Sequence, residues 1–498
     1  MELISIIAFV LISIITAAYI YFKNAFNYWK SRGIPFEEPI IPYGSVKGLN
    51  KTIHTSDITK RIYDKFKGTA KYCGVYLMAA PIAMILDLDL VKHILVKDFS
   101  NFSDKGFYSN EEDDPLSANL FTLDGDKWKK LRAKLTPTFT SGKMKIMFSH
   151  VVEVGERFND CLRGIVQENN EVEIKDLLAR FTTDVIGTCA FGIECNSLKD
   201  PNAGFKNMGE KAFRPRYPSL IQFLVIGMKN VSRRFHVKIM PDDVSEFFLR
   251  MVYNTVKYRE KNDVHRNDFM DILIKLKNDK NALEGLTLNE IAAQAFLFFL
   301  AGFETSSTTL MFCLYELSKN PDIQSKARKV VQEAYEKHGT FTYEMMMDMP
   351  YIDHILQETL RRYPPVPFVS RIAKNDYNVP ETSNIIEKGT IIVIPTYAIQ
   401  NDPEYYPDPE RFDPDRFAAD IARERDTMTW LPFSEGPRNC VGLRFGMMQA
   451  RTGLAILLNN FEFTLNSKTI EPLSYIPDCF VLNPKGGVHL NLIPIKSK

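Results

Sequence analysis

One cysteine stands in a segment whose neighbours would expose its sulfur. Around Cys440 the sequence reads Phe433-Ser-Glu-Gly-Pro-Arg-Asn-Cys-Val-Gly442, with glycines on both sides of the cysteine. Glycine reaches backbone conformations that are closed to other residues, so the pattern predicts a tight loop. An apolar helix predicted from Leu443 to Leu458 would direct its positive end at the sulfur. The arrangement predicts a stabilised thiolate, the form that a nucleophile or a metal ligand requires.

The other cysteines and the histidines narrow this chemistry. A catalytic cysteine would need a histidine partner, and the eight histidines carry no local signature, which leaves a distant partner open. The seven cysteines are odd in number, are dispersed and form no C-x-x-C pair. This spacing argues against a secreted disulfide scaffold, a zinc ribbon and a C-x-x-C-H cofactor attachment.

A second candidate is the acid–alcohol pair Glu304-Thr305, which follows Ala301-Gly302-Phe303 within an apolar helical pattern. A glycine inside a helix costs about 1 kcal/mol, so Gly302 needs a packing reason or the close approach of another group. A buried carboxylate beside a hydroxyl can relay protons into an enclosed site. Taken alone, the pattern also fits a packing glycine and a partnered acid.

Long helices must position these residues. Thr287-Leu-Asn-Glu290 is a capping-box pattern, and the helix that it opens is predicted to end at Asn320-Pro321, a length of about 45 Å. The apolar spacing from 124 to 341 is mostly helical. Short strands are predicted at 71–77, 82–86 and 391–394. We therefore predict a mainly α fold with a minor β subdomain.

Two further segments are set apart by composition. The stretch 100–123 is polar and irregular, and its acidic run 111–114 is predicted to be a solvated loop. The apolar stretch 220–228 is either a buried helix or a loop that dips into a bilayer.

The chain begins with an uncharged run from Leu3 to Phe22, long enough to span a membrane. It lacks the positive start and the short apolar stretch of a cleaved signal peptide, so we predict an uncleaved anchor. Lys23, Lys30 and Arg32 follow, which places this flank in the cytosol and the N-terminus in the lumen. The predicted organisation is a transmembrane helix at 1–22, a proline-containing linker at 23–50 and a folded body at 51–498.

Overall composition excludes one large class of function. The 498 residues include 62 basic and 61 acidic side chains, giving a formal charge of +1. With no basic excess to neutralise phosphates, binding to nucleic acid is not expected. Apolar residues at 45% and charged residues at 25% are typical of a globular protein.

Five separated signatures resemble those of a cytochrome P450, and together they extend over essentially the whole chain. Phe433–Gly442 resembles the haem-binding loop, and Ala301–Thr305 resembles the oxygen-activation motif of the central helix. Glu358-x-x-Arg361 resembles the E-x-x-R motif, and Pro409-Glu-Arg-Phe412 resembles the motif whose arginine completes a Glu–Arg–Arg network. Trp128-x-x-x-Arg132 resembles the helix that meets the haem from the side.

The resemblance is closest to one branch of the family. The anchor followed by a proline linker is similar to the microsomal class, and residues 401–417 resemble the insect xenobiotic-metabolising branch. One position departs from the family loop, which commonly has glycine where this chain has Ser434. If φ is positive there, serine carries a strain of about 1 kcal/mol or more.

The resemblance implies roles for particular residues. Cys440 would be the axial ligand of haem b, Phe433 and Gly436 would form the loop, and Gly302 would let dioxygen lie against the helix. Glu304 and Thr305 would deliver protons. The haem propionates would be held by Trp128, Arg132, Arg371 and Arg438. The structural network would be Glu358, Arg361 and Arg411. The substrate pocket would be lined by Phe107, Phe121, Phe303, Val366 and Phe480.

The implied activity is that of a monooxygenase, which inserts one oxygen atom of O₂ into lipophilic small molecules such as insecticides and plant toxins. The chain has no dinucleotide fingerprint, so electrons from NADPH would come through a membrane-bound NADPH–cytochrome P450 reductase, with cytochrome b5 left open as a second partner. A basic helix face would favour docking of the reductase; it consists of Lys127, Lys129, Lys130 and Lys134. The expected location is the endoplasmic reticulum membrane, with the haem-thiolate domain in the cytosol.

Two alternatives from other classes stay open at this point. One is a haem-thiolate isomerase or dehydratase that needs no external electrons. The other is a haem-binding sensor without catalysis, for which an intact acid–alcohol pair would have no evident use.

Overall fold

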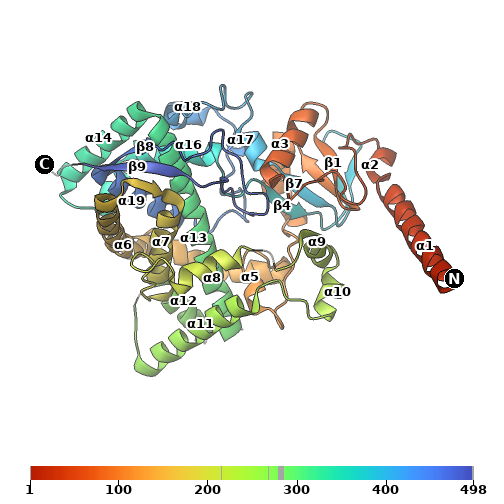
Figure 1. Cartoon of the computed structure of the whole chain (residues 1–498), viewed down its shortest axis with the longest axis horizontal. Helices are drawn as coiled ribbons and strands as arrows, with labels where there is room; N and C mark the ends of the chain where they lie inside the picture. Colours follow the sequence, from red (N-terminus) through yellow and green to blue (C-terminus); the bar gives the residue numbers. More distant parts are fainter. Residues whose placement is uncertain (1, 215, 267, 279–284, 496–498) are drawn as a thin grey trace.

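A helical body and a small β module make up the chain in the computed structural model, which describes residues 2–214, 216–266, 268–278 and 285–495. The sheet module lies toward one end of the molecule, beside the N-terminal helix, and most of the long helices lie toward the other end (Figure 1). The predicted fold class, mainly α with minor sheets, is confirmed.

The β module contains the three predicted strands. Its order is β1 (Tyr72–Leu77), β2 (Ala80–Ile85), β7 (Ile391–Ile394) and β4 (Val369–Ile372). β2 and β7 pair in parallel although about 300 residues separate them, and the other pairs are antiparallel. α3 (Thr55–Phe66) packs its buried face on this sheet. A hairpin of β5 (Tyr377–Asn378) and β6 (Ile385–Ile386) lies between β4 and β7 in sequence.

A second sheet ties the C-terminal strands to the helical body. Its order is β3 (Glu171–Glu173), β9 (His489–Pro494) and β8 (Phe461–Leu465), with both pairs antiparallel.

The central element of the body is α13 (Leu288–Lys319), which starts and ends where the sequence predicts. Thr287 and Glu290 form the expected capping box, and Asn320 follows the last turn. α13 packs against α7 (Ile174–Ile186), α16 (Pro350–Arg362) and α19 (Leu443–Asn460). The longer helices around this core are α5 (Gly125–Leu135), α6 (Ser141–Glu168), α8 (Gly204–Ala212), α11 (Asp242–Asn262), α12 (Phe269–Lys277) and α14 (Pro321–His338). The shorter helices are α4 (Leu88–Lys92), α15 (Tyr343–Met347), α17 (Thr396–Gln400) and α18 (Ala419–Arg423).

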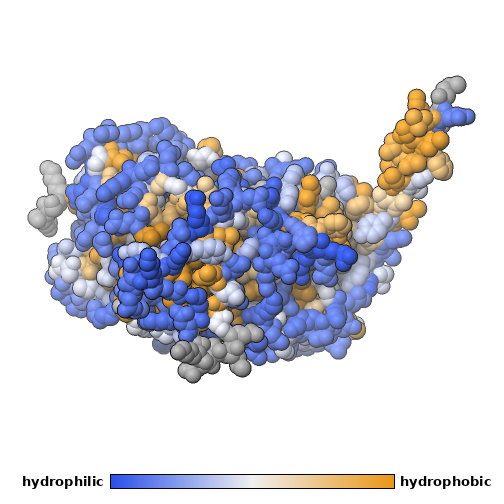
Figure 2. Space-filling model, turned by 90° about the horizontal axis from the view of Figure 1, so that it is seen from below, coloured by the Kyte–Doolittle hydropathy of each residue, from blue (hydrophilic) through white to orange (hydrophobic). Residues whose placement is uncertain are grey.

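The N-terminal helix α1 (Glu2–Ala25) stands away from the body. It has no buried residue, and its apolar surface projects from a largely hydrophilic molecule (Figure 2). By length and composition α1 is a candidate membrane span. The other helix that passes this test, α13, is mostly buried inside the protein and is a core helix.

The segment after α1, predicted to be a proline-containing linker, packs against the β module. In α2 (Tyr28–Ser31), Trp29 is 1% exposed, and its indole N–H donates to the Val75 carbonyl oxygen at 3.3 Å. The indole lies against Gly74 so closely that a Cβ at that position would overlap the ring. The folded body therefore begins before residue 51, because part of the segment 23–50 completes the β module.

A segment predicted to be a solvated loop is instead held at one end. Asp114 is buried and accepts hydrogen bonds from the Ile239 N–H at 2.8 Å and the Met240 N–H at 3.1 Å. These partners follow the short helices α9 (Ser219–Gly227) and α10 (Lys229–Arg234). The apolar stretch 220–228 lies mostly in the helix α9, on which the side chains of Ile221 and Leu224 are exposed and that of Val225 is buried.

A buried charge network joins α16 to the segment after α17, with one correction to its membership. Glu358 and Arg361 are fully buried and paired, with Nε 2.7 Å from one carboxylate oxygen. Arg416 is the third member, its Nε lying 3.5 Å from Glu358 Oε1. Arg411, the predicted member, is exposed. The chain carries two Pro-x-Arg-Phe sequences in succession, and the second, in the turn Pro414–Phe417, packs against α16.

The network can be tested by exchanging the two arginines separately. Arg416→Met should lower the free energy of unfolding by about 2 kcal/mol, because it leaves a buried carboxylate with one cation fewer. Arg411→Met, the matched control, should change it by less than about 0.5 kcal/mol. Urea unfolding followed by circular dichroism measures both. An equal loss in the two variants would contradict the assignment of Arg416.

Candidate functional site

A large cavity lies where the Cys440 loop, the middle of α13, strand β4 and the segment 105–121 meet. Aromatic and aliphatic side chains line most of it, and cations line one region. The sequence-predicted residues on its wall are Phe107, Phe121, Trp128, Arg132, Gly302, Thr305, Val366, Arg371, Phe433, Arg438, Cys440 and Phe480. Residues from distant parts of the chain thus meet in one cavity.

The Cys440 loop is tight, as its glycines predict. The Cys440 N–H donates to the Phe433 carbonyl oxygen at 2.9 Å, which closes the loop on itself. Gly436 has φ +75°, and a Cβ there would overlap the Leu95 carbonyl oxygen. Ser434 has φ +57°, so the serine does adopt the left-handed conformation in which glycine is favoured.

The Cys440 side chain is accessible because it faces the cavity, although protein surrounds the loop. Burial raises the pKa of the Cys440 thiol, while the Gly442 N–H and the charges of Lys105 and Arg132 act to lower it. The expected low pKa is therefore not obtained from protein groups alone. A coordinated metal cation is what would hold this sulfur as a thiolate. No cluster of three or more His, Cys, Asp or Glu side chains suited to a metal occurs among the described residues, so the sulfur would be a single protein ligand.

Two buried arginines lie beside the loop without a full set of partners. Arg371, in β4, donates from Nη1 to the Ser370 carbonyl oxygen at 2.8 Å and from Nη2 to Ser434 Oγ at 3.4 Å. Burial and the charge of Arg438 lower the pKa of Arg371 to about 9. Arg438 lies 4.4 Å over the Trp128 ring, with Asp124 Oδ1 3.4 Å from Nη1. The Nε atom of each arginine has no hydrogen-bond partner in the described part of the chain.

Arg132, a predicted propionate ligand, is also tied to the Cys440 loop. Its Nη1 and Nη2 donate to the Asn439 carbonyl oxygen at 2.9 Å and to Asn439 Oδ1 at 2.8 Å. The side chain lines the cavity, but its bonds tie α5 to the residue before Cys440.

Sequence reasoning missed Lys105, a cation on the same wall. Its Nζ lies 3.7 Å from the centre of the Phe121 ring, and burial together with Arg371 and Arg438 lowers its pKa well below the usual range. Its backbone N–H donates to Asp124 Oδ1 at 2.9 Å, beside Arg438. Nothing local distinguishes this lysine from solvated ones; only the fold brings it to the arginines.

The residues fit a planar apolar group that carries a metal and carboxylates. The accessible sulfur supplies the metal ligand, the apolar walls accept the ring system, and the incompletely partnered cations suit carboxylates. Haem b has each of these features. Cys440, Arg371, Arg438 and Lys105 would hold it.

The middle of α13 separates the two members of the predicted acid–alcohol pair. Thr305 lines the cavity, and its hydroxyl donates to the Ala301 carbonyl oxygen at 2.5 Å. Glu304 does not line the cavity; its carboxylate lies 3.0 Å from Lys175 Nζ of α7. Successive residues of a helix point about 100° apart, which accounts for the separation. Gly302 has its packing reason, since a Cβ there would meet Ile186 Cδ1 of α7 at 2.5 Å.

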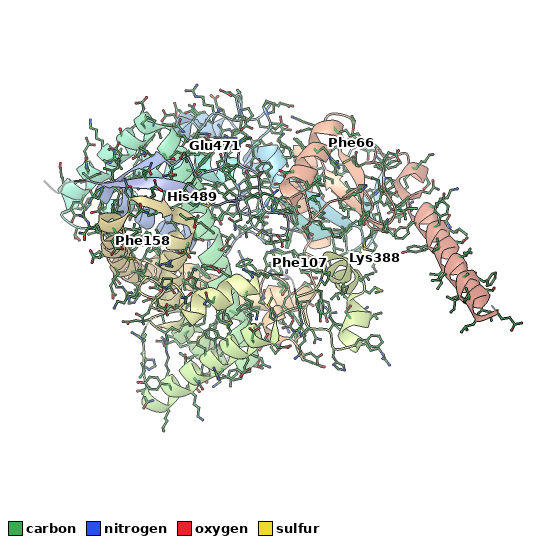
Figure 3. All side chains as sticks on the ribbon, in the orientation of Figure 1. Phe66, Phe107, Phe158, Lys388, Glu471 and His489 are labelled. Carbon is green, nitrogen blue, oxygen red and sulfur yellow. The ribbon has the colours of Figure 1, made fainter. Side chains whose placement is uncertain are left out.

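Four of the five predicted substrate contacts lie on the cavity wall. Phe107 and Phe121 have ring centres 5.0 Å apart, and Phe480 lies 6.5 Å from Phe121. Figure 3 places Phe107 near the middle of the molecule. Phe303 is wrong as a contact: it is fully buried, stacks on Phe299 with ring centres 5.7 Å apart, and is absent from the wall. Leu297 and Phe298 of α13 line the cavity instead.

Comparison with known proteins gives a consistent result. The family model described as Cytochrome P450 matches residues 35–491. The chain is 45% identical over 482 residues to cytochrome P450 6A1 of Musca domestica, covering 95% of each. It is 47% identical over 479 residues to cytochrome P450 6a9 of Drosophila melanogaster, covering 94% of this chain and 95% of the relative. It is 47% identical over 497 residues to cytochrome P450 6a8 of the same fly, covering 98% of each.

The glycine of the loop provides a test of the site. Gly436→Ala should lower the haem content of the purified protein at least tenfold, because the new methyl group would displace the loop from the Leu95 carbonyl. Ser434→Gly is the matched control, since it relaxes a residue with positive φ in the same loop and should keep haem content near that of the parent. Absorption spectra normalised to protein measure both. Normal haem content in Gly436→Ala would contradict the tight packing of this loop.

Proposed function

Because this chain belongs to the cytochrome P450 family, we propose that it is a monooxygenase of lipophilic foreign compounds, supplied with electrons from NADPH by a membrane-bound reductase. Its membership establishes the P450 monooxygenase class. The observation that supports the proposal best is the accessible Cys440 sulfur at the wall of a largely apolar cavity.

The chain's own residues have separable tasks in this reaction. Haem b, when bound, supplies the activation of dioxygen for insertion into a carbon–hydrogen bond. Cys440 is the ligand, and Arg371, Arg438 and Lys105 neutralise the carboxylates, for which the planar fork of arginine is well suited. Thr305 is the hydroxyl that offers a proton at the cavity wall. Glu304, held by Lys175 on the far side of α13, is the acid from which protons reach that wall.

The walls select the substrate class. Phe107, Phe121 and Phe480 enclose an apolar space that excludes water and favours lipophilic, aromatic molecules. Together with the resemblance to insect relatives, this supports insecticides and plant toxins as substrates.

The surface supports attachment to a membrane. The candidate span α1 is followed by a positive flank, and further exposed apolar side chains lie on and after α9, namely Ile221, Leu224, Met228, Val231 and Phe235. We place the N-terminus in the lumen of the endoplasmic reticulum and the body in the cytosol, in accordance with the charge of the flank.

The reductase would dock where α5 reaches the surface. Lys129 and Lys130 are exposed on this helix, whose buried face carries Trp128 and Arg132. Lys127 is paired with Glu111 at 2.8 Å. The expected basic face therefore consists mainly of Lys129 and Lys130. Cytochrome b5 is a second candidate for this surface.

The proposed reaction can be tested directly. The full-length protein in lipid nanodiscs should give the reduced carbon-monoxide spectrum of a thiolate-ligated haem, and Cys440→Ala should lose it. With reductase, NADPH and ¹⁸O₂, a panel of insecticides, plant toxins, steroids and fatty acids should yield products carrying one labelled oxygen. A rearranged product formed without NADPH would indicate an isomerase, and NADPH consumption without product from any compound would contradict the proposal.

The docking surface makes a separate prediction. Lys129→Glu combined with Lys130→Glu should slow the first electron transfer from the reductase about tenfold at low salt, and the difference should shrink as salt rises. Substrate affinity should stay unchanged. The control is Lys257→Glu with Lys261→Glu, the same charge change at two exposed lysines of α11. Stopped-flow reduction measures the rates, and equal rates in the two double variants would contradict this docking site.

A further inference from the structure

Gln294 is a buried polar residue of the cavity to which the proposed reaction assigns no task. It lies in the second turn of α13, is 2% exposed and belongs to the cavity lining. Ala301 and Thr305 follow seven and eleven residues later, on the same face of the helix. Along the helix axis these residues are about 10 Å and 16 Å from Gln294.

The orientation of the Gln294 amide is fixed by its partner. The Leu120 N–H donates to Gln294 Oε1 at 2.9 Å. A backbone N–H is only a donor, so the atom that faces Leu120 must be the amide oxygen. The other end of the group, Nε2, is therefore a pair of N–H donors.

These donors lack a partner. Nε2 is buried and has no hydrogen-bond acceptor among the described residues. Buried donors are rarely left unpaired, because each forgoes its bonds to water without compensation. A hydrogen-bond acceptor from outside the described residues would satisfy the Nε2 donors.

Two threonine hydroxyls on this wall already have acceptors. The Thr305 and Thr309 hydroxyls donate to carbonyl oxygens of their own helix, at 2.5 Å and 2.8 Å. Lys105 is a cation and lies with the arginines that suit carboxylates. Gln294 is thus the neutral donor of a region whose other side chains, Phe107, Phe121 and Leu297, are apolar.

We propose that Gln294 Nε2 donates a hydrogen bond to a neutral acceptor oxygen of the substrate, such as that of a ketone, ester or ether. Gln294 is then a specificity-determining residue, and it selects lipophilic molecules whose acceptor lies about 10 Å or more from the carbon that is oxidised near Ala301 and Thr305. This inference rests on the proposed function and names the substrate class within it.

The same amide also links substrate recognition to the shape of the wall. Through Oε1 it holds the backbone of Leu120, and the next residue, Phe121, contributes its ring to the cavity. A substrate oxygen bonded to Nε2 would therefore satisfy the same amide that holds the backbone next to Phe121.

The test compares two ligands that differ in one group. A long aryl ketone and the hydrocarbon with CH₂ in place of the carbonyl are titrated into the haem-loaded, full-length protein, and binding is followed by the haem absorption shift. The parent protein should bind the ketone at least tenfold more tightly than the hydrocarbon. Gln294→Leu should reduce this preference to about onefold. Ser306→Ala, which removes another polar group of the same wall, should keep it.

The ligand pair separates loss of the donor from damage to the wall. If Gln294→Leu only disturbed the segment around Leu120, both ligands would bind more weakly and their ratio would persist, which would overturn the proposal. Equal binding of the two ligands by the parent protein would overturn it as well. The measurement needs no NADPH, reductase or product. A preserved ketone preference without turnover would contradict the proposed reaction and leave the hydrogen bond established.

Discussion

The structure depends on one constraint, which is to keep a single sulfur accessible at the wall of a largely apolar cavity. A free loop would bury its cysteine or expose it to bulk water. Here the loop is fixed from two sides: Gly436 lies against the Leu95 carbonyl, and Asn439 accepts both bonds of Arg132. The first contact comes from the residues after α4 and the second from α5. The sulfur is therefore placed by elements that lie more than 300 residues earlier in the chain.

The same loop lies beside an excess of positive charge, which is carried by Arg371, Arg438 and Lys105. Burying cations without partners is unfavourable, and the lowered pKa values of Arg371 and Lys105 record that cost. A ligand with carboxylates would remove it, and its binding free energy would add to the stability of the folded state. The fold and its cofactor are thus coupled.

The sequence predicted what is determined locally. The capping box of Thr287, the tight loop at Cys440 and the short strands follow from propensity and pattern, and each lies where expected. The family motifs supplied the Cys440 loop and part of the rest of the cavity wall. The sequence-based predictions failed where a residue's role depends on which face of a helix packs against the cavity, or on which of two similar sequences packs against a helix. Arg411 and Arg416 occupy equivalent places in adjacent Pro-x-Arg-Phe sequences, and only the packing against α16 decides between them. Glu304 and Phe303 likewise lie on faces of α13 that the spacing of residues alone does not assign.

The same reasoning applies to the N-terminal attachment. Prolines at 35, 39 and 42 suggest a spacer, yet Trp29, just before them, is buried and hydrogen-bonded to Val75 of strand β1. A buried tryptophan immobilises the chain on both of its sides, so α1 leaves the body from a fixed point rather than from the end of a long tether. If α1 spans a bilayer, the body is held close to that bilayer with a restricted set of orientations. Helices α9 and α10, which carry exposed apolar side chains, lie in the same half of the molecule as α1 (Figure 1). A short, docked connection would let these helices meet the membrane that α1 crosses. Tyr108 and Asp114, which follow the cavity residue Phe107, are hydrogen-bonded to the segment after α10.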